Sequence, residues 1–302
     1  MSGTSVTLAC RAMGRELRRL RANAGLQQAE AARLAETSPQ SIGRIEDGQY
    51  TRITSFQINA LCNACGATDA ERRAVLDLLE DVRAARKSKA EGGWWRAYSD
   101  QISMRFDHYL ALERAADRLI AWNVTTVPGP LQTAEYRRAL AWAESPDTPS
   151  SEIERRIEWA AMRKKELLDK GQREPLQINA ILFEAVLRNQ IGGPAVMRGE
   201  LEHLLNMSER PNVSLRVVSF ARTSYLGSLS GSFLFLEFPP LSQSKLVEPP
   251  VVYVEQYVGD LFLSDEPDLG KYRHALSEIT RVALDDDESR ALVQEIAEEY
   301  NP

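Results

Sequence analysis

The 302-residue sequence has few of the residues that build disulfide frameworks and catalytic metal sites. It contains only three cysteines and three histidines. Three cysteines do not make a framework of paired bridges, which argues against a disulfide-stapled secreted domain. The histidines, His108, His203 and His274, form no His-Glu-x-x-His pair, so the usual zinc-protease motif is absent. We expect no metal ion and no cofactor.

Long apolar runs are also missing, and none approaches the roughly 20 residues that cross a bilayer. Residues 1–10 lack a basic stretch followed by a long apolar core, so we expect no secretory signal. A hydrophobic content of 43% and a charged content of 26% are ordinary for a globular protein. We therefore expect a cytoplasmic, nucleoid-associated protein with no membrane partner.

Acidic side chains outnumber basic ones, 43 to 37, so the net charge is −6. Its distribution is uneven: residues 1–90 carry 14 basic and 10 acidic side chains, whereas residues 91–302 carry 23 and 33. A basic head on an acidic body is expected when only the head meets phosphate. Chance variation would explain so small an excess equally well, so the interpretation depends on a motif.

Catalytic motifs are missing as well. The segment Gly227–Gly231 has a leucine where a nucleophile elbow needs a serine midway between its glycines. Residues 285–288 are acidic but lack the spacing and the glycine of an EF-hand loop. No glycine-rich loop ending in Gly-Lys is present to cradle phosphates. We expect a binding protein rather than an enzyme.

The most informative stretch is Leu26–Gly48, which predicts two short helices joined by a tight turn. The first helix is expected over residues 28–34 and the second over residues 39–47. Ser38 is a suitable N-cap for the second helix, and Pro39 fits its first position, where a missing N–H costs nothing. Gly48 can adopt the left-handed conformation that ends a helix.

The second helix has one apolar face and one polar face. Ile42 and Ile45 lie three residues apart and are expected to face inward. That spacing leaves Gln40, Ser41 and Arg44 on the outer face. Long side chains with several hydrogen-bonding groups suit the base edges of a DNA major groove. An ordinary helical hairpin is the alternative reading.

This stretch resembles the helix-turn-helix of Xre-type, phage-repressor-like regulators. The resemblance is carried by a set of spaced positions: Gln28, Ala32, Ser38, Ser41, Ile42, Ile45, Glu46 and Gly48. It implies that residues 39–47 read base edges and that Gln28 bonds a backbone phosphate. It also implies that the loop after Gly48, through Thr51 and Arg52, contacts the DNA backbone. The candidate DNA-binding residues are therefore Gln28, Ser38, Gln40, Ser41, Arg44, Thr51 and Arg52.

The rest of the head is expected to be helical. Apolar spacings predict a helix before the motif and two helices after it, which makes an all-α, five-helix domain over residues 1–86. We expect only weak phosphate contacts from Arg18 and Arg21 on the first helix. The Cys62-x-x-Cys65 spacing invites a metal site, but no further ligands lie nearby, so core packing is favoured.

A charged linker is expected over residues 87–93, with a rigid continuation of the fifth helix as the alternative. Residues 94–302 form a second domain, helical over 94–170 and α+β over 171–302. We expect a helix over residues 103–123 and, later, strands that form a mostly antiparallel sheet. Aromatic residues are concentrated in the helical part, where they either pack the core or line an effector pocket.

The second region resembles the uncharacterised C-terminal domain behind Xre-type heads in actinobacterial regulators, the WhiJ-like group. The resemblance is carried by several short segments: 127–133, 192–194, 209–213, 229–233, 251–255 and 259–261. Pro130 stands where that group usually has leucine, and residues 242–248 read as a small insertion. The resemblance implies that some members pair with a short protein encoded next door, in a toxin–antitoxin-like arrangement.

Together these observations predict a sequence-specific transcriptional regulator that binds double-stranded DNA. One reading helix covers too few base pairs for useful specificity, so we expect a homodimer on a two-fold operator. The C-terminal domain is expected to bind a partner protein. The alternative is a small-molecule sensor with an aromatic effector pocket, and an enzyme with a DNA-binding head is least favoured.

Overall fold

The computed structural model describes residues 8–89, 104–169, 174–222 and 226–300. Within the described residues, no helix is both long and apolar enough to cross a membrane. Contacts divide the chain into two units. The first holds the N-terminal helices together with α6 (Met104–Ala115) and the segment Phe238–Pro249, and the second holds the rest. The domain limits 1–86 and 94–302 remain a prediction.

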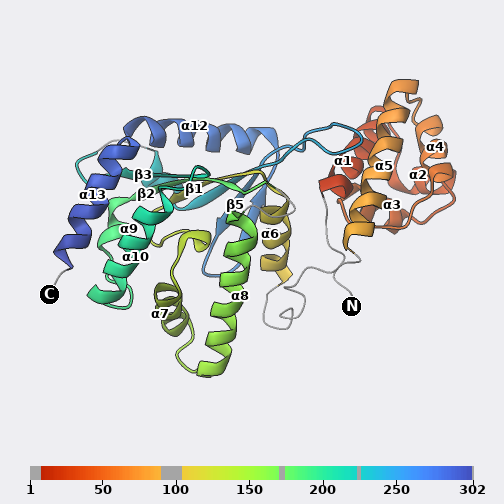
Figure 1. The fold of residues 1–302 in the computed structure, drawn as a ribbon. Helices are drawn as coiled ribbons and strands as arrows, with labels where there is room; N and C mark the ends of the chain where they lie inside the picture. Colours follow the sequence, from red (N-terminus) through yellow and green to blue (C-terminus); the bar gives the residue numbers. More distant parts are fainter. Residues whose placement is uncertain (1–7, 90–103, 170–173, 223–225, 301–302) are drawn as a thin grey trace. The chain divides into compact units, whose positions relative to one another are not determined.

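The N-terminal head is helical, as the motif predicts (Figure 1). Its helices are α1 (Leu8–Asn23), α2 (Gln28–Leu34), α3 (Pro39–Glu46), α4 (Ser55–Ala64) and α5 (Asp69–Lys89). Helix α5 continues to Lys89, so it extends into the segment expected as a linker. Apolar side chains from all these helices share one core, which fixes the head as a compact support for α3.

Helices α1 and α3 approach each other closely at Gly14. A Cβ atom on Gly14 would lie 2.1 Å from the carbonyl oxygen of Ile45, so only glycine fits there. The apolar face of α3 is buried against this surface, because Ile42 and Ile45 are 3% and 2% exposed. The opposite face of α3 is therefore the one that is free to meet a partner.

The second unit is built on a six-stranded sheet with the strand order β3-β2-β1-β4-β5-β6. The strands are β1 (Arg118–Asn123), β2 (Gln177–Phe183), β3 (Val213–Val218), β4 (Phe233–Glu237), β5 (Val251–Glu255) and β6 (Asp260–Leu263). Strands β1, β2 and β3 are parallel, and the pairs β1–β4, β4–β5 and β5–β6 are each antiparallel.

The sheet is thus mixed, and the expectation of a mostly antiparallel sheet was wrong. The connections explain the difference. The chain passes from β1 through α7 and α8 to β2, and from β2 through α9 and α10 to β3. A helical crossover returns the chain to the same end of the sheet, which makes consecutive strands parallel.

The expected helix over residues 103–123 was also wrong in its second half. Helix α6 ends at Ala115, and β1 begins at Arg118. The stretch is extended because it pairs on both sides, with β2 along one edge and β4 along the other. A central strand buried on both faces reads as a continuous apolar run, and its periodicity does not distinguish it from a buried helix.

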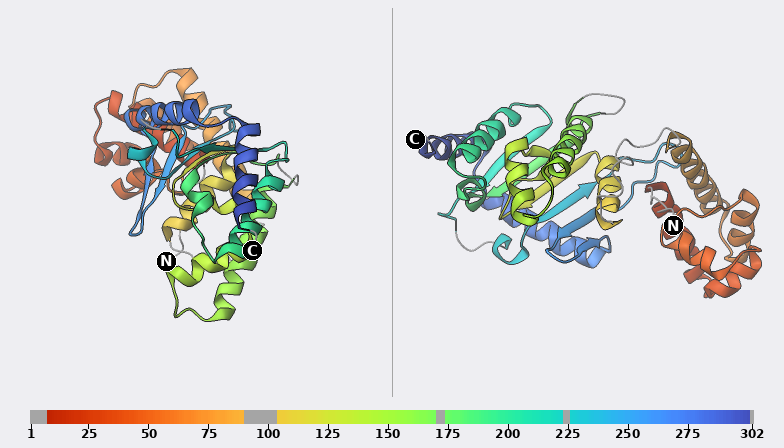
Figure 2. Two further views of the ribbon diagram at one scale, coloured as in Figure 1. Left: turned by 90° about the vertical axis from the view of Figure 1, so that its left-hand side faces the viewer. Right: turned by 90° about the horizontal axis from the view of Figure 1, so that it is seen from below.

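Helices cover both faces of the sheet. They are α7 (Ala134–Glu144), α8 (Ser150–Leu168), α9 (Glu184–Arg188), α10 (Pro194–Met207), α12 (Glu266–Val282) and α13 (Asp286–Glu299), with short turns η2 (Gly129–Leu131) and α11 (Gly227–Ser230). Helix α12 lies over one face, and α7, α8 and α10 lie on the other (Figures 1 and 2). The core beneath α12 contains Trp122, Phe233 and Phe235.

Candidate DNA-binding surface

Helix α3 is held at both ends by local signals that the sequence carries. The hydroxyl of Ser38 accepts a hydrogen bond from the Ser41 amide at 3.1 Å, and Pro39 occupies the first turn. At the other end Gly48 has a φ of +71°, and its amide donates to the carbonyl of Ile45. Capped ends and a buried isoleucine face fix which side chains α3 presents outward.

The exposed face of α3 carries Gln40 and Arg44, one helical turn apart. Ser41 is half-buried, and its hydroxyl lies 2.9 Å from the hydroxyl of the exposed Ser38. Ser38 and Ser41 therefore stabilise the helix start while their oxygens stay near its surface. Gln40 and Arg44 are both exposed, as contacts with base edges would require, and the contacts themselves stay a prediction.

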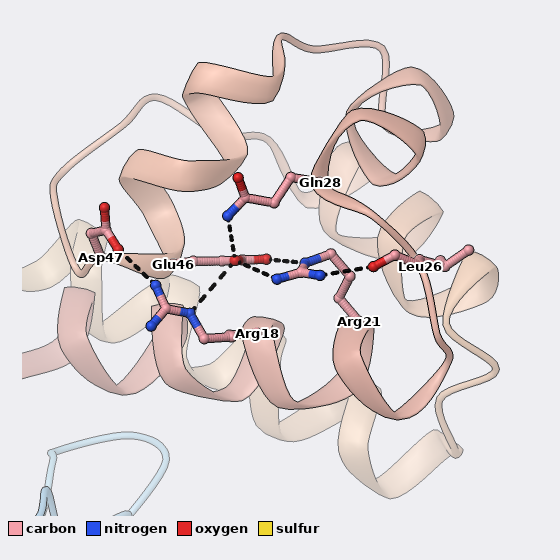
Figure 3. A network of polar contacts seen from close by, with 6 residues as sticks. All are labelled: Arg18, Arg21, Leu26, Gln28, Glu46 and Asp47. Atoms are coloured by element: carbon pink, nitrogen blue, oxygen red, sulfur yellow. Dashed lines mark hydrogen bonds and ion pairs between the residues drawn. The ribbon is translucent and has the colours of Figure 1, made fainter. Parts of the chain in front are cut away.

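Behind α3 lies a polar network centred on Glu46, whose side chain is buried (Figure 3). Arg21 of α1 donates to both of its carboxylate oxygens, at 2.5 and 2.8 Å. Arg18 lies 3.6 Å from the same carboxylate and also pairs with Asp47 at 2.6 Å. The network joins α1 to the last turn of α3.

The same network holds Gln28, the first residue of α2. Its side-chain amide nitrogen donates to Glu46 at 2.9 Å, which leaves its oxygen unused by this bond. Burial by itself would raise the pKa of Glu46, but hydrogen bonds from Arg21 and Gln28 and the charges of Arg21 and Arg18 outweigh it, so the pKa is lowered. Glu46 is therefore ionised at neutral pH and fixes Gln28 beside α3.

The loop between α3 and α4 is anchored from inside. Ile53 is buried, while Arg52 is exposed and Thr51 is half-buried. Thr54 caps α4 through a reciprocal pair of hydrogen bonds with Gln57. Two residues expected at the DNA backbone, Thr51 and Arg52, are thus carried by a loop with fixed ends.

Charge pairing separates the arginines of the head into two groups. On α1, Arg18 and Arg21 pair with Glu46 and Asp47, and Arg19 pairs with Glu16 and Glu71. By contrast, Arg33, Arg44 and Arg52 are exposed, and no ion pair is found for them within residues 8–85. Three exposed arginines therefore lie on and beside the helix-turn-helix without such a pair.

The cysteines of the head do not form a site. Cys62 is buried in the core, and Cys65 is half-buried at its edge. Burial raises the pKa of both thiols, which disfavours the thiolate form that metal binding needs. Among the described residues no cluster of His, Cys, Asp and Glu is arranged to hold a metal ion.

The aromatic residues of the second region are divided. Trp94, Trp95 and Tyr98 lie outside the described residues, whereas Trp122 and Tyr136 are fully buried core residues. A cleft of about 160 Å³ lies elsewhere, between the sheet and α12. Its lining is mixed rather than aromatic: Arg118, Ile120, Asn179, Ala180, Ile181, Ser214, Arg216, Leu276 and Thr280.

Comparison with known families assigns both parts of the chain. The model of the "Domain of unknown function (DUF5753)" matches residues 106–295, which is more than half of the sequence. The chain belongs to the DUF5753 family. A "Helix-turn-helix domain" model matches residues 12–75, ahead of the DUF5753 region. The head that precedes the DUF5753 region therefore has the architecture of a DNA-binding transcriptional regulator.

Among solved structures, the DUF5753 chain is similar to the clp gene regulator ClgR from Corynebacterium glutamicum. The match has 27% identity and a TM-score of 0.22, and it covers 28% of this chain and 90% of the other. No curated protein matches the sequence.

The sequence did not predict two features of the structure. Glu46 was expected as a motif position without its network, and residues 242–248 were expected as an insertion without a role. Both depend on pairing between distant residues, such as Arg21 with Glu46 and Asp81 with Ser244. For the network of Glu46, the available signal was an acidic residue within the motif and an arginine-rich stretch at residues 11–21 that could pair with it.

Proposed function

We propose that this DUF5753 protein is a sequence-specific transcriptional regulator of Xre type that acts by binding rather than by catalysis. Helix α3 enters the major groove of double-stranded DNA, where Gln40 prefers adenine and Arg44 prefers guanine. The observation that carries the proposal is the exposed Gln40–Arg44 face on a helix whose opposite face is buried.

Contacts to the DNA backbone surround this reading helix. The side-chain oxygen of Gln28 and the phosphate oxygens are all acceptors, so Gln28 reaches a phosphate through the second hydrogen of its amide or through a water molecule. Ser38, Ser41, Thr51 and Arg52 donate to neighbouring phosphates. These contacts set the register of α3 without reading sequence.

The experiment is selection of bound duplexes from a random pool by the full-length protein, followed by footprinting upstream of its own gene. The expected result is one two-fold motif with two half-sites about one or two helical turns apart. Enrichment of no sequence above background, at salt low enough for phosphate contacts to hold, would contradict the proposal.

A two-fold operator requires a homodimer, and the second unit offers a surface for it. The hairpin between β5 and β6 exposes apolar side chains, with Tyr257 100%, Val258 87% and Leu261 52% exposed. Strand β6 is the last strand in the order of the sheet, and an edge strand is a common place for a further chain to add. We propose that a second copy of this chain pairs there, so that the same surface of each protomer forms a two-fold symmetric interface.

The resemblance to the actinobacterial WhiJ-like group supports a further partner, a small protein encoded by a neighbouring gene. Such a protein would act on the DUF5753 region in the cytoplasm, at the nucleoid. Co-purification from the native host with mass spectrometry tests this, and the expected result is a small protein in fixed ratio whose gene adjoins this one.

Sensing of a small molecule is the second candidate, and the cleft beneath α12 favours it. A volume of about 160 Å³ admits only a small ligand. Its mixed lining of guanidinium, amide and hydroxyl groups suits a polar ligand, and it differs from the aromatic-lined pocket that the sequence suggested as an alternative. Mass spectrometry of molecules released from the native protein separates this candidate from the protein partner.

A further inference from the structure

The segment Phe238–Pro249 joins β4 to β5, yet its contacts place it in the unit that holds the head. We call residues 238–249 the clasp. It leaves the sheet after Glu237 and returns at Val251, and it lies beside α1 (Figure 1). Leu241 of the clasp packs against the apolar core of the head.

Asp81 on α5 is the first anchor of the clasp. Its buried carboxylate accepts hydrogen bonds from the amides of Gln243 and Ser244 at 2.8 and 3.0 Å. The hydroxyls of Ser242 and Ser244 donate to it at 2.9 and 2.8 Å. Burial would raise the pKa of Asp81, but these donors outweigh it and the pKa is lowered. The hydrogen bonds from the clasp therefore replace the water that the buried carboxylate of Asp81 does not contact.

Glu248 is the second anchor, and it is 2% exposed. It pairs with Arg15, and it lies 3.6 Å from Arg11, both on α1. Arg11 is itself largely covered, so Glu248 is the counter-charge that allows its guanidinium to stay there. Without that counter-charge, Arg11 is more stable turned toward water.

Arg11 also touches the end of the reading helix. A Cβ atom on Gly48 would lie 3.0 Å from Cγ and 3.1 Å from Cα of Arg11. Gly48 is the residue that ends α3 and starts the loop with Thr51 and Arg52. Glu248 pairs with the guanidinium of Arg11, whereas the atoms nearest Gly48 are Cα and Cγ of Arg11, so the coupling from the clasp to the DNA-facing loop runs through the first turn of α1.

We propose that the clasp is a releasable docking element that controls DNA binding: when docked, it holds Arg11 against Gly48 and keeps the loop after α3 in its phosphate-binding geometry. The inference rests on the proposed function of the head. Because the contacts are mostly polar, the clasp can open more readily than a large apolar interface. Both of its ends continue into strands, so any ligand or partner that shifts β4 or β5 acts on it.

The test compares full-length Asp81→Asn and Glu248→Gln with the wild type. Hydrogen–deuterium exchange is measured over residues 241–248 and 49–54, and affinity is measured for the duplex selected by the wild type. Asp77→Asn is the matched control, because Asp77 is exposed one turn earlier on the same helix. If Asp81→Asn does not fold, Ser242→Ala combined with Ser244→Ala removes two donors and leaves the carboxylate intact.

The expected result is faster exchange in both segments and a roughly 5- to 150-fold loss of affinity, the usual range for coupled sites. Faster exchange over residues 241–248 alone, with unchanged affinity, would show a packing loop without control and would overturn the proposal. Unchanged exchange in the variants would overturn it as well. If the wild type selects no duplex, the proposed function fails, and coupled exchange of the two segments still decides whether the clasp acts on the loop.

Discussion

At the scale of single residues, the candidate surface depends on a division between buried and exposed charges. Glu46 is buried and satisfied by Arg21 and Gln28, whereas Arg44, two residues earlier, is exposed on the same helix. The buried pair fixes the position of α3, and the exposed guanidinium is left to a partner. Substitutions at these two positions should therefore have different effects.

Replacing Arg44 with alanine should weaken binding to the selected operator by roughly 1–3 kcal/mol and relax the preference at one base position. The reason is the loss of a bidentate contact to a base, while the fold is untouched. Fluorescence anisotropy on the operator and single-base variants measures this. Arg73→Ala, an exposed change on α5, is the control, and wild-type preference in Arg44→Ala would remove Arg44 from the contacts.

Replacing Glu46 with glutamine should lower stability at neutral pH and flatten its acid dependence. The pKa of Glu46 in the folded head lies below its ordinary value of 4.5, so its contribution is present above that pH and is lost as the pH falls through the folded pKa. Thermal melts between pH 3 and 7 measure the difference between variant and wild type.

The gap between the two melting curves should shrink as the pH drops below about 4.5. A gap that stays constant over that range would show that the ionised form of Glu46 contributes nothing to stability. Glu80→Gln, an exposed change on α5, provides the comparison.

At the scale of elements, the sequence predicts the helices of the head more closely than the strands behind it. Ser38, Pro39 and Gly48 each lie within a few residues of the end of α3 that they set, so α2 and α3 were expected close to where they lie. By contrast, β1 was expected as a helix, because its pairing partners are far away in the sequence. Local capping residues determine where a helix begins and ends, whereas the strand or helix form of an apolar run depends on the segments that pack or pair with it.

The close approach of α1 and α3 leads to a prediction at this scale. Gly14→Ala should destabilise the head by about 1–3 kcal/mol, because the new Cβ meets the carbonyl of Ile45 and forces the helices apart. Urea denaturation measures the loss. Gly199→Ala in α10 is the matched control, because nothing lies within 4 Å of its Cβ, and there a gain of about 0.5–1 kcal/mol is expected. Equal effects at both positions would contradict the close approach.

At the scale of the whole molecule, the basic head precedes a DUF5753 region built on a mixed sheet. The chain returns from that sheet to the head through residues 238–249, so the two parts of the sequence are interleaved rather than consecutive.

The dimer prediction belongs to this scale. Combining Tyr257→Ser with Val258→Asp should convert a dimer into a monomer, because it puts a charge on the apolar hairpin beside β6. Sedimentation velocity at micromolar concentration measures the change. Leu229→Asp, an equally exposed apolar position away from the hairpin, should leave the dimer intact. A dimer that survives the double substitution would place the interface elsewhere.

The sequence by itself determined the local features of the reading helix: its cap, its glycine end, its buried isoleucines and its outward Gln40 and Arg44. These depend on spacings of a few residues, which a single chain displays directly. Only the tertiary structure decided the parallel half of the sheet, the burial of Glu46 against Arg21, and the docking of Asp81 and Glu248 with the clasp. Each of these joins residues far apart in the chain, and neither periodicity nor composition records which distant partners a folded chain brings together.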